Sequence, residues 1–260
     1  MAGAAVSLVV RDLAVSFGGV AALAGVTFRV EPGTITSLIG PNGAGKTTAF
    51  DAITGYVRPL RGEIGYGDAV LSGLRPCEIA ARGIVRTFQR TSVFPQLTVF
   101  DNVLTGLHLR GTATLAGILG GSRRVRGEEA RLAQDADAIL AFVGLAERRR
   151  RRAVELAGGE QRLLELAVAL AARPRLLLLD EPGAGLTAAE KRAVAGLIRT
   201  IRDQGVTVLL VEHDMRLVMG VSHHVIVLNG GRVIAEGPPA AVQASPEVIR
   251  AYLGSARADA

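Results

Sequence analysis

Residues 35–48 read ITSLIGPNGAGKTT, and this stretch decides the fold. Its first part, Ile35 to Ile39, is a short apolar run typical of a buried strand. A helix is expected from about Lys46 to Thr54, with Gly55 as its stop. Between them lies a glycine-rich turn that fits the pattern G-x-x-x-x-G-K-[ST]. A strand, such a turn and a helix in direct succession predict an α/β fold with a ligand site at the end of the strand.

The glycine-rich turn has the chemistry of a phosphate cradle. Small residues let a tight loop point its backbone N–H groups at phosphate oxygens, and the following helix directs its positive end at the same charge. Lys46 is expected to reach the β- and γ-phosphates of a nucleotide, and the Thr47 hydroxyl to bind Mg²⁺. Only Lys46 and Lys191 of the 30 basic residues are lysine, so a lysine here favours a ligand that needs a compact ammonium. The predicted phosphate-binding residues are Gly40, Pro41, Asn42, Gly43, Ala44, Gly45, Lys46, Thr47 and Thr48.

Two carboxylates follow a second apolar run, Leu176 to Leu179. Four consecutive leucines predict a strand that is buried on both faces of a parallel sheet. Asp180 and Glu181 then stand at its carboxyl end, where open α/β sheets bind their ligands. We expect Asp180 to hold Mg²⁺ through a water molecule, and Glu181 to orient or deprotonate the water that attacks the γ-phosphate.

The remaining pattern indicates three kinds of structure. Residues 6–16 and 26–31 alternate like strands of an antiparallel sheet. From about 98 to 153 the periodicity is helical, with Thr98 as a candidate cap and a loop or broken helix at 111–127. After this insert, strands alternate with helices, which predicts a parallel sheet. The expected elements there are helices at about 160–172, 188–204, 214–219 and 246–253, strands at 176–179, 206–211 and 225–228, and an Asn229-Gly230 hairpin leading to 233–234.

A third motif, Leu156-Ala157-Gly158-Gly159-Glu160-Gln161, lies just ahead of the first of those helices. Together with the phosphate cradle and the two carboxylates, it makes the chain resemble the ATP-binding cassette (ABC) ATPases, whose signature motif is L-S-G-G-Q. The resemblance implies an α/β P-loop NTPase fold with a mostly parallel core sheet, an N-terminal antiparallel β-subdomain and an inserted helical subdomain. It also implies a dimer in which the signature of one subunit, formed by Leu156, Ala157, Gly158, Gly159 and Glu160, completes the ATP site of the other.

This resemblance covers nearly the whole chain and predicts its organisation. We expect one ABC ATPase domain over 1–260. Its catalytic core takes in 1–97 and 154–245, the helical insert 98–153, and the C-terminal helix and tail 246–260.

Further motifs follow in the order of the family. Gln89 matches the glutamine loop, which contacts the metal or its water and couples to the membrane partner. His213 matches the switch histidine that contacts the γ-phosphate. Phe17 stands where the family places an aromatic ring that stacks on adenine, with core packing as the alternative. The resemblance therefore implies ATP as the nucleotide, catalytic roles for Glu181, His213 and Gln89, and Mg²⁺ ligands at Thr47, Gln89 and Asp180.

Two positions depart from the family pattern. Ala157 replaces the usual serine of the signature, which removes a hydroxyl that would contact the γ-phosphate. Thr187 replaces the aspartate of the D-loop, at 184–187, and this puts the cross-dimer contact of that loop in doubt.

Within the family, the chain resembles the branched-chain amino-acid uptake ATPases of bacteria. The stretches that carry this likeness are 83–89, 97–103, 212–220 and 248–254. The implied function is the ATP-hydrolysing subunit of a bacterial ABC importer for branched-chain or other hydrophobic amino acids. The alternatives are an importer of urea or another amide, and a non-transport ABC ATPase of soluble assemblies, whose long coiled-coil insertion or second cassette this sequence lacks.

The implied partners are a second ABC ATPase subunit, identical or related, integral membrane permease subunits and, indirectly, an extracytoplasmic solute-binding protein. No apolar run approaches the length of a membrane span, so the chain is not expected to cross a membrane by itself. The resemblance implies a peripheral protein on the cytoplasmic face of the inner membrane. Despite a net charge of +6, no nucleic acid is expected, because the basic run Arg148–Arg152 has no interleaved aromatic residues. That run is interpreted as a solvated face or as a patch that touches lipid headgroups or a partner.

Overall fold

The computed structural model describes residues 6–87, 93–108 and 123–255, with 108, 123–126 and 253–255 described in their backbone only. Contacts divide the chain into two compact units. Unit 1 is made of Met1–Arg86, Arg175–Ala184 and Lys191–Ala260, and unit 2 of Thr87–Pro174 and Gly185–Glu190. Unit 2 is larger than the expected insert at 98–153, because the helix that follows the insert packs with its helices. The boundaries of the insert stay a prediction.

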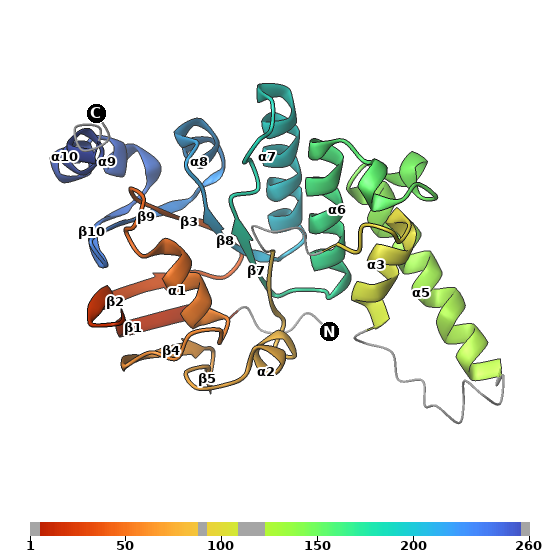
Figure 1. Ribbon diagram of the computed structural model, residues 1–260, viewed down its shortest axis with the longest axis horizontal. Helices are drawn as coiled ribbons and strands as arrows, with labels where there is room; N and C mark the ends of the chain where they lie inside the picture. The colour runs from red at the N-terminus through yellow and green to blue at the C-terminus, as the bar shows by residue number, and fades with distance from the viewer. Residues whose placement is uncertain (1–5, 88–92, 109–122, 256–260) are drawn as a thin grey trace. The chain divides into compact units, whose positions relative to one another are not determined.

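Unit 1 contains two sheets (Figure 1). The first is antiparallel in the order β2-β1-β4-β5, and its strands are β1 (Leu8–Phe17), β2 (Val20–Val30), β4 (Arg61–Tyr66) and β5 (Ala69–Val70). The second has the order β10-β9-β3-β8-β7-β6, with β3 (Ile35–Ile39), β6 (Ile84–Arg86), β7 (Leu176–Asp180), β8 (Thr207–Val211), β9 (His224–Asn229) and β10 (Arg232–Gly237). Its neighbours are parallel except β9 and β10, which form the predicted hairpin. The expected antiparallel subdomain and mostly parallel core sheet are confirmed.

The core of unit 1 covers both faces of the second sheet, because successive strand residues point to opposite sides. One cluster joins Leu38 of β3 to the antiparallel sheet and to α1 (Lys46–Ile53). The other joins Ile39, the next residue, to α8 (Met215–Val221), α9 (Pro239–Gln243) and α10 (Pro246–Ser255). All five residues of β3 are buried. The strand that leads into the glycine-rich turn is therefore held from both sides.

Two short helices were not predicted. They are α2 (Pro76–Ala80) and α9, and each is five residues long and begins at a proline. Proline suits the first turn of a helix, but five residues are too few for a helical periodicity to show in the sequence. The predicted long helix at 188–204 is present as α7 (Ala188–Asp203).

Unit 2 is helical, as its periodicity predicts. Its helices α3 (Val99–His108), α5 (Arg123–Phe142) and α6 (Gly158–Ala171) pack against one another. Thr98 lies at the predicted cap, where its hydroxyl accepts the N–H of Asp101 at 3.0 Å. The loop or broken helix expected at 111–127 lies largely outside the described residues, and α5 begins at Arg123.

The basic run Arg148–Arg152 makes contacts within unit 2. Arg148 binds Glu160 at 2.7 Å, and Arg152 binds Glu155 at 2.8 Å. Arg149 binds Asp137 and also lies over the ring of Phe100, 3.8 Å from its centroid. These three side chains stay between 38% and 56% exposed, so the solvated face and the partner patch both remain predictions. Arg149 links the run to α5, and Arg148 links it to the start of α6.

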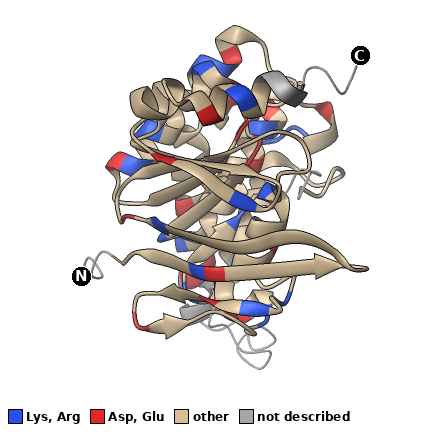
Figure 2. Cartoon of the chain, turned by 90° about the vertical axis from the view of Figure 1, so that its left-hand side faces the viewer, with Lys and Arg blue, Asp and Glu red and all other residues tan. Residues whose placement is uncertain are grey.

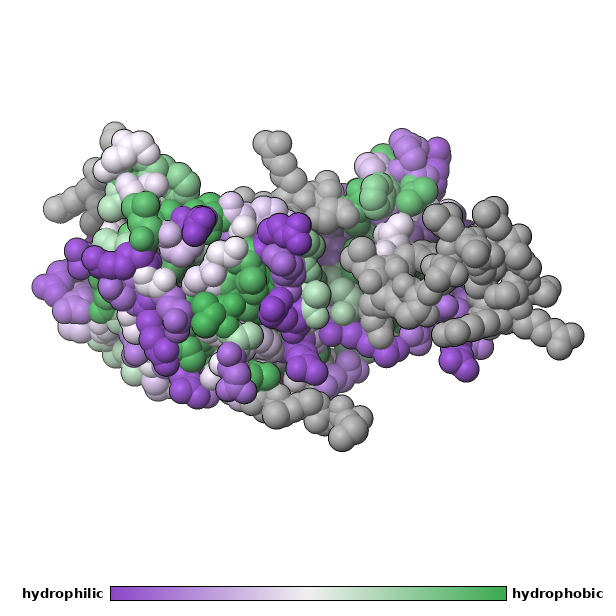
Figure 3. Space-filling view, turned by 90° about the horizontal axis from the view of Figure 1, so that it is seen from below, coloured by the Kyte–Doolittle hydropathy of each residue, from purple (hydrophilic) through white to green (hydrophobic). Residues whose placement is uncertain are grey.

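The surface mixes charges and polarities. Figure 2 shows acidic and basic positions interspersed over the face in view, and Figure 3 shows apolar surface exposed among polar surface on the face seen from below. Within the described ranges, no helix is both long and apolar enough to cross a bilayer.

Candidate functional site

The glycine-rich turn lies between β3 and α1, as predicted. A side chain is excluded at two of its glycines by the backbone that packs against them. A Cβ at Gly40 would lie 2.1 Å from the carbonyl oxygen of Leu228, and a Cβ at Gly45 would lie 2.6 Å from that of Ala22. Gly45 also has φ +103°, which a residue with a side chain rarely adopts. These contacts seat the turn against β9 and β2.

A hairpin from the far end of the chain braces the turn. The N–H of Gly231 donates to the carbonyl oxygen of Ala44 at 3.1 Å, and the carbonyl oxygen of Gly231 accepts the N–H of Ala24 at 2.8 Å. One residue of the β9–β10 hairpin thus ties the turn to β2. The backbone shape of the turn is therefore set by contacts with β2, with β9 and with the turn of the β9–β10 hairpin.

Lys46 begins α1 and folds its side chain over the turn. Its Nζ donates to the carbonyl oxygens of Gly40 at 2.7 Å and Pro41 at 2.9 Å, and the residue is buried. Burial lowers the pKa of Lys46, while the negative charges of Glu181 and Asp180 oppose that shift. The ammonium and the two carboxylates therefore share one electrostatic neighbourhood, as the two sequence motifs predict.

Asp180 ends β7 with its side chain fully buried. Its Oδ2 accepts a hydrogen bond from Nη2 of Arg86 at 2.7 Å. Nη1 of the same arginine binds Asp51 of α1 at 2.5 Å. Burial raises the pKa of Asp180, and the Arg86 guanidinium opposes that shift. Arg86 thus bridges the end of β7 to α1.

Glu181 and His213 face each other across the ends of β7 and β8. Oε1 of Glu181 lies 2.7 Å from Nε2 of His213, and both side chains are partly exposed. Glu181 has φ +49°, a left-handed conformation that costs energy in a residue other than glycine. Its N–H donates to the carbonyl oxygen of Val211 at 2.9 Å, which fixes the turn at the end of the strand pair.

The oxygens near the cradle fit Mg²⁺, a hard cation that is bound by one or two protein oxygens together with phosphates and water. Asp180 supplies a buried carboxylate at the end of β7, and Thr47 supplies an exposed hydroxyl in the first turn of α1. The third predicted ligand, Gln89, lies outside the described residues.

The predicted signature begins α6 in unit 2. The helix starts at Gly158, two residues before the predicted start, so both glycines belong to its first turn. Oε2 of Glu160 accepts the N–H of Ala157 at 3.1 Å, and Oε1 of Glu160 binds Arg148. The Arg148 guanidinium is the main cause that lowers the pKa of Glu160. Leu156 is buried, whereas Ala157 and Gly158 are exposed at the helix start, where backbone N–H groups favour an anion.

Comparison with known proteins gives the family. The family described as ABC transporter matches residues 23–184, which contain the glycine-rich turn, the signature and both carboxylates. This chain belongs to the ABC transporter family. It is an ABC ATPase with a nucleotide-binding cassette. Residues 232–258 match a second family, which is described as branched-chain amino acid ATP-binding cassette transporter.

Relatives of the ABC chain match it over nearly its full length. It is 43% identical to the high-affinity branched-chain amino acid transport ATP-binding protein BraF of Pseudomonas aeruginosa and 42% identical to LivG of Escherichia coli, in each case over 96% of this chain and 98% of the relative. Among solved structures, the ADP conformation of MJ1267, an ATP-binding cassette of an ABC transporter, has a TM-score of 0.84 and 31% identity. That match covers 96% of this chain and 99% of the other.

The structure gives positions for three further residues of the predicted ABC site, but their contacts do not test the predicted roles. Phe17 ends β1 with 53% of its surface exposed, so core packing, the alternative interpretation, is wrong for it. Thr48 is partly exposed in α1. Thr187 caps α7, since its hydroxyl accepts the N–H of Glu190 at 3.3 Å and donates to Glu190 Oε2 at 2.7 Å.

Two residues of this region were missed in the sequence. Arg86, at the end of β6, binds Asp180, and Glu212, at the end of β8, is buried beside His213. A signal was present for both, because each is a charged residue at the carboxyl end of an apolar run that forms a strand of the parallel sheet. Their hydrogen-bond partners come from other parts of the chain, and these partners could not be predicted from the sequence.

Proposed function

We propose that this chain energises the import of branched-chain amino acids by hydrolysing ATP at the site formed by the glycine-rich turn, Asp180, Glu181 and His213. The observation that carries the proposal is the contact of Glu181 Oε1 with His213 Nε2 at 2.7 Å, beside the buried ammonium of Lys46. The amino-acid class comes from the relatives, because BraF and LivG match almost the whole chain and the branched-chain family matches its C-terminal part.

In this mechanism the residues position and neutralise charge. Lys46 and the backbone of the turn hold the β- and γ-phosphates, and Phe17 stacks on the adenine ring. Glu181 accepts the proton of the attacking water, while His213 holds Glu181 and contacts the γ-phosphate. Thr47, Gln89 and Asp180, the last through water, would hold Mg²⁺, which when bound neutralises charge that develops on the phosphate oxygens. Arg86 keeps Asp180 oriented.

The proposal includes a dimer of cassettes. The residues of the signature, at the start of α6, complete the ATP site of the partner subunit with backbone N–H groups, so the missing hydroxyl of Ala157 is not required. ATP then holds two cassettes together because both sides neutralise its phosphates, and loss of the γ-phosphate releases them. The partner is a second copy or a related cassette.

We further propose that membrane permease subunits dock on unit 2 at the cytoplasmic face of the membrane, with a solute-binding protein acting on the far side. Phe94, Leu97 and Val154 expose apolar side chains there. Backbone bonds from Val154 to Pro95 and from Ala153 to Leu97 bring the two segments together, close in sequence to Gln89. Apolar residues grouped on a surface favour contact with a protein partner.

Glu181→Gln tests the hydrolytic site. The amide cannot accept a proton, so turnover of ATP should fall by at least about 100-fold while the affinity for ATP changes by less than about threefold. Phosphate release and equilibrium ATP binding measure the two quantities. Glu236→Gln, at an exposed glutamate of β10, is the control and should hydrolyse ATP as the unaltered chain does. A normal rate in Glu181→Gln would remove Glu181 from its proposed role.

The transport role is tested by purification from membranes. The tagged chain should retain integral membrane subunits, and ATP hydrolysis by that complex in vesicles should rise with leucine, isoleucine or valine and their binding protein. Stimulation by urea instead would change the substrate class. Copurification of ribosomes or DNA without membrane subunits would contradict a transport role.

A further inference from the structure

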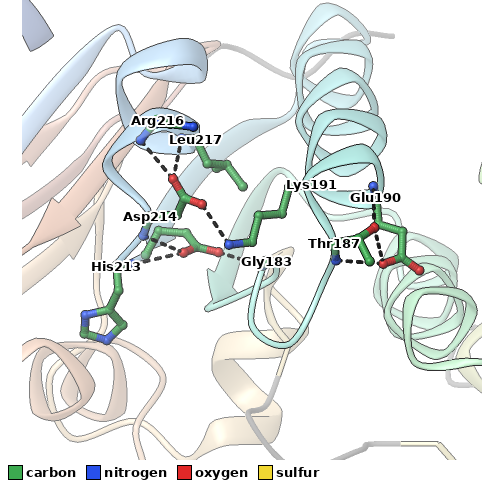
Figure 4. Close-up of polar contacts among 9 residues, drawn as sticks. Gly183, Thr187, Glu190, Lys191, His213, Asp214, Arg216 and Leu217 are labelled. Carbon is green, nitrogen blue, oxygen red and sulfur yellow. Dashed lines mark hydrogen bonds and ion pairs between the residues drawn. The ribbon is translucent and has the colours of Figure 1, made fainter.

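A buried carboxylate lies between the two loops that carry Glu181 and His213. Glu212 follows β8 directly and is only 4% exposed. Its Oε1 accepts the N–H of Gly183 at 2.6 Å. Its Oε2 accepts the N–H of His213 at 2.9 Å and that of Asp214 at 3.3 Å. The contacts of His213, Asp214 and Gly183 with this carboxylate are drawn in Figure 4.

These bonds begin where the sheet ends. The β7–β8 pairing runs to Asp180 opposite Val211. The N–H of Glu181, the next residue, donates to the carbonyl oxygen of Val211 and continues the bonding between the two strands by one residue. Beyond this point the backbones separate into two loops, one with Glu181 and Gly183 and the other with His213 and Asp214. The carboxylate of Glu212 takes the place of the sheet bonds and ties one loop to the other.

We infer that Glu212 is a positioning residue that holds Glu181 and His213 at their contact distance and so sets the rate of ATP hydrolysis. This inference rests on the proposed function, because it assigns Glu212 a role at the proposed hydrolytic site. Glu181 has a left-handed backbone, which persists only where its surroundings enforce it. Without the carboxylate, buried N–H groups on both loops would lose their acceptor, and the loops would rearrange to reach water.

The arrangement requires a carboxylate in particular. An ionised carboxylate accepts on both oxygens, whereas an amide accepts on one side and donates on the other. A glutamine at 212 can satisfy Gly183 or the His213 loop, but not both. Size is conserved in that exchange, so it separates the bridging role from packing.

The second loop is also held from its other side. Asp214 binds Nζ of Lys191, on α7, at 2.8 Å and caps α8 by accepting the N–H groups of Arg216 at 2.9 Å and Leu217 at 3.3 Å (Figure 4). The bond to Asp214 is the main cause that raises the pKa of Lys191, and the charge of Glu212 adds to it. Asp214 therefore fixes the loop of His213 on one side, and Glu212 ties this loop to the one that carries Glu181.

Glu212→Gln is the test. A displaced pair of reacting groups lowers kcat by about 10- to 100-fold, whereas ATP binding by Lys46 and the turn is left alone, so KM should change by less than about threefold. Glu165→Gln is the matched control. Glu165 is also a buried glutamate, 6% exposed, but it lies on α6 and binds Arg162 at 2.8 Å. This control should keep kcat and KM.

Amide hydrogen exchange gives a readout that does not depend on hydrolysis. In Glu212→Gln the N–H of Gly183 or that of His213 should exchange at least about tenfold faster than in the unaltered chain, because one loop loses its acceptor. Both amides should keep their protection in Glu165→Gln.

The outcomes separate this inference from the function on which it rests. A kcat within twofold of the unaltered chain, or equal loss of ATP affinity and kcat, would overturn the positioning role. Unchanged protection of both amides would overturn it as well. If Glu181→Gln hydrolyses ATP normally, the proposed function fails, and the exchange rates still decide whether Glu212 ties the two loops.

Discussion

At the scale of single residues, Lys46 does two things at once. Its ammonium bonds the carbonyl oxygens of Gly40 and Pro41, and so closes the turn from which the phosphate contacts are expected. It also offsets the charge of Glu181 and Asp180. Loss of the side chain would remove a cation for the phosphates and loosen the loop that presents the N–H groups.

Lys46→Ala should therefore weaken ATP binding by about 10- to 100-fold, which is the effect expected from losing one or two hydrogen bonds to a charged group. Where binding survives, turnover of ATP should be abolished. Titration calorimetry with ATP and Mg²⁺ measures the affinity. Arg29→Ala removes an exposed cation that pairs with Glu31 and should leave the affinity unchanged. Normal binding and turnover in Lys46→Ala would contradict the cradle.

At the scale of elements, helices α3 and α6 approach each other closely. A Cβ at Gly106 would lie 2.8 Å from the carbonyl oxygen of Val168 and 2.9 Å from the Cβ of Ala171. Only a residue without a side chain allows this crossing, and α6 carries the signature at its start. The distance between α3 and α6 therefore helps to fix the position of the signature within unit 2.

Gly106→Ala should lower the free energy of unfolding by about 1–3 kcal/mol, because backbone atoms cannot move aside cheaply. Gly196→Ala is its counterpart within α7, where a Cβ would have nothing within 4 Å. That exchange should raise stability by about 0.5–1 kcal/mol. Urea unfolding measures both, and equal effects of the two exchanges would mean that helix propensity alone decides.

At the scale of the whole molecule, the proposed dimer makes each ATP site composite. One chain supplies Lys46 and its partner supplies Gly158 and Gly159. One inactive variant with a defect at Lys46 and another with a defect in the signature should then form one intact ATP site when they pair. A site contained in a single chain would not be restored by mixing.

Equal amounts of Lys46→Ala and Gly159→Asp chains should hydrolyse ATP at about a quarter of the unaltered rate, because half of the dimers are mixed and each mixed dimer has one intact site of two. Each variant alone should be nearly inactive, the second because a carboxylate meets the γ-phosphate. Phosphate release after mixing measures the recovery. No recovery, with mixed dimers shown by tag capture, would contradict a site shared between copies.

Continuous apolar runs and local motifs were predictable. The apolar runs at 35–39 and 176–179 form β3 and most of β7. Such strands can be predicted because a strand that is buried on both faces is a continuous apolar run, whichever strands lie beside it. The short elements α2 and β5 were missed because they have neither a continuous apolar run nor enough residues to show a periodicity. Strand β2 is longer than its alternating part at 26–31 and starts at Val20.

The amino-acid sequence alone determined the family and the glycine-rich turn between a strand and a helix, and it predicts the residue types of the site, since these depend on local spacing along one strand, one turn and one helix. Tertiary structure alone decided which groups meet. Arg86 reaches Asp180 from another strand, and Glu212 joins loops that lie 29 positions apart. Such contacts follow from the order β8-β7-β6 in the sheet, and strand order is set by the packing of both its faces rather than by any stretch of sequence.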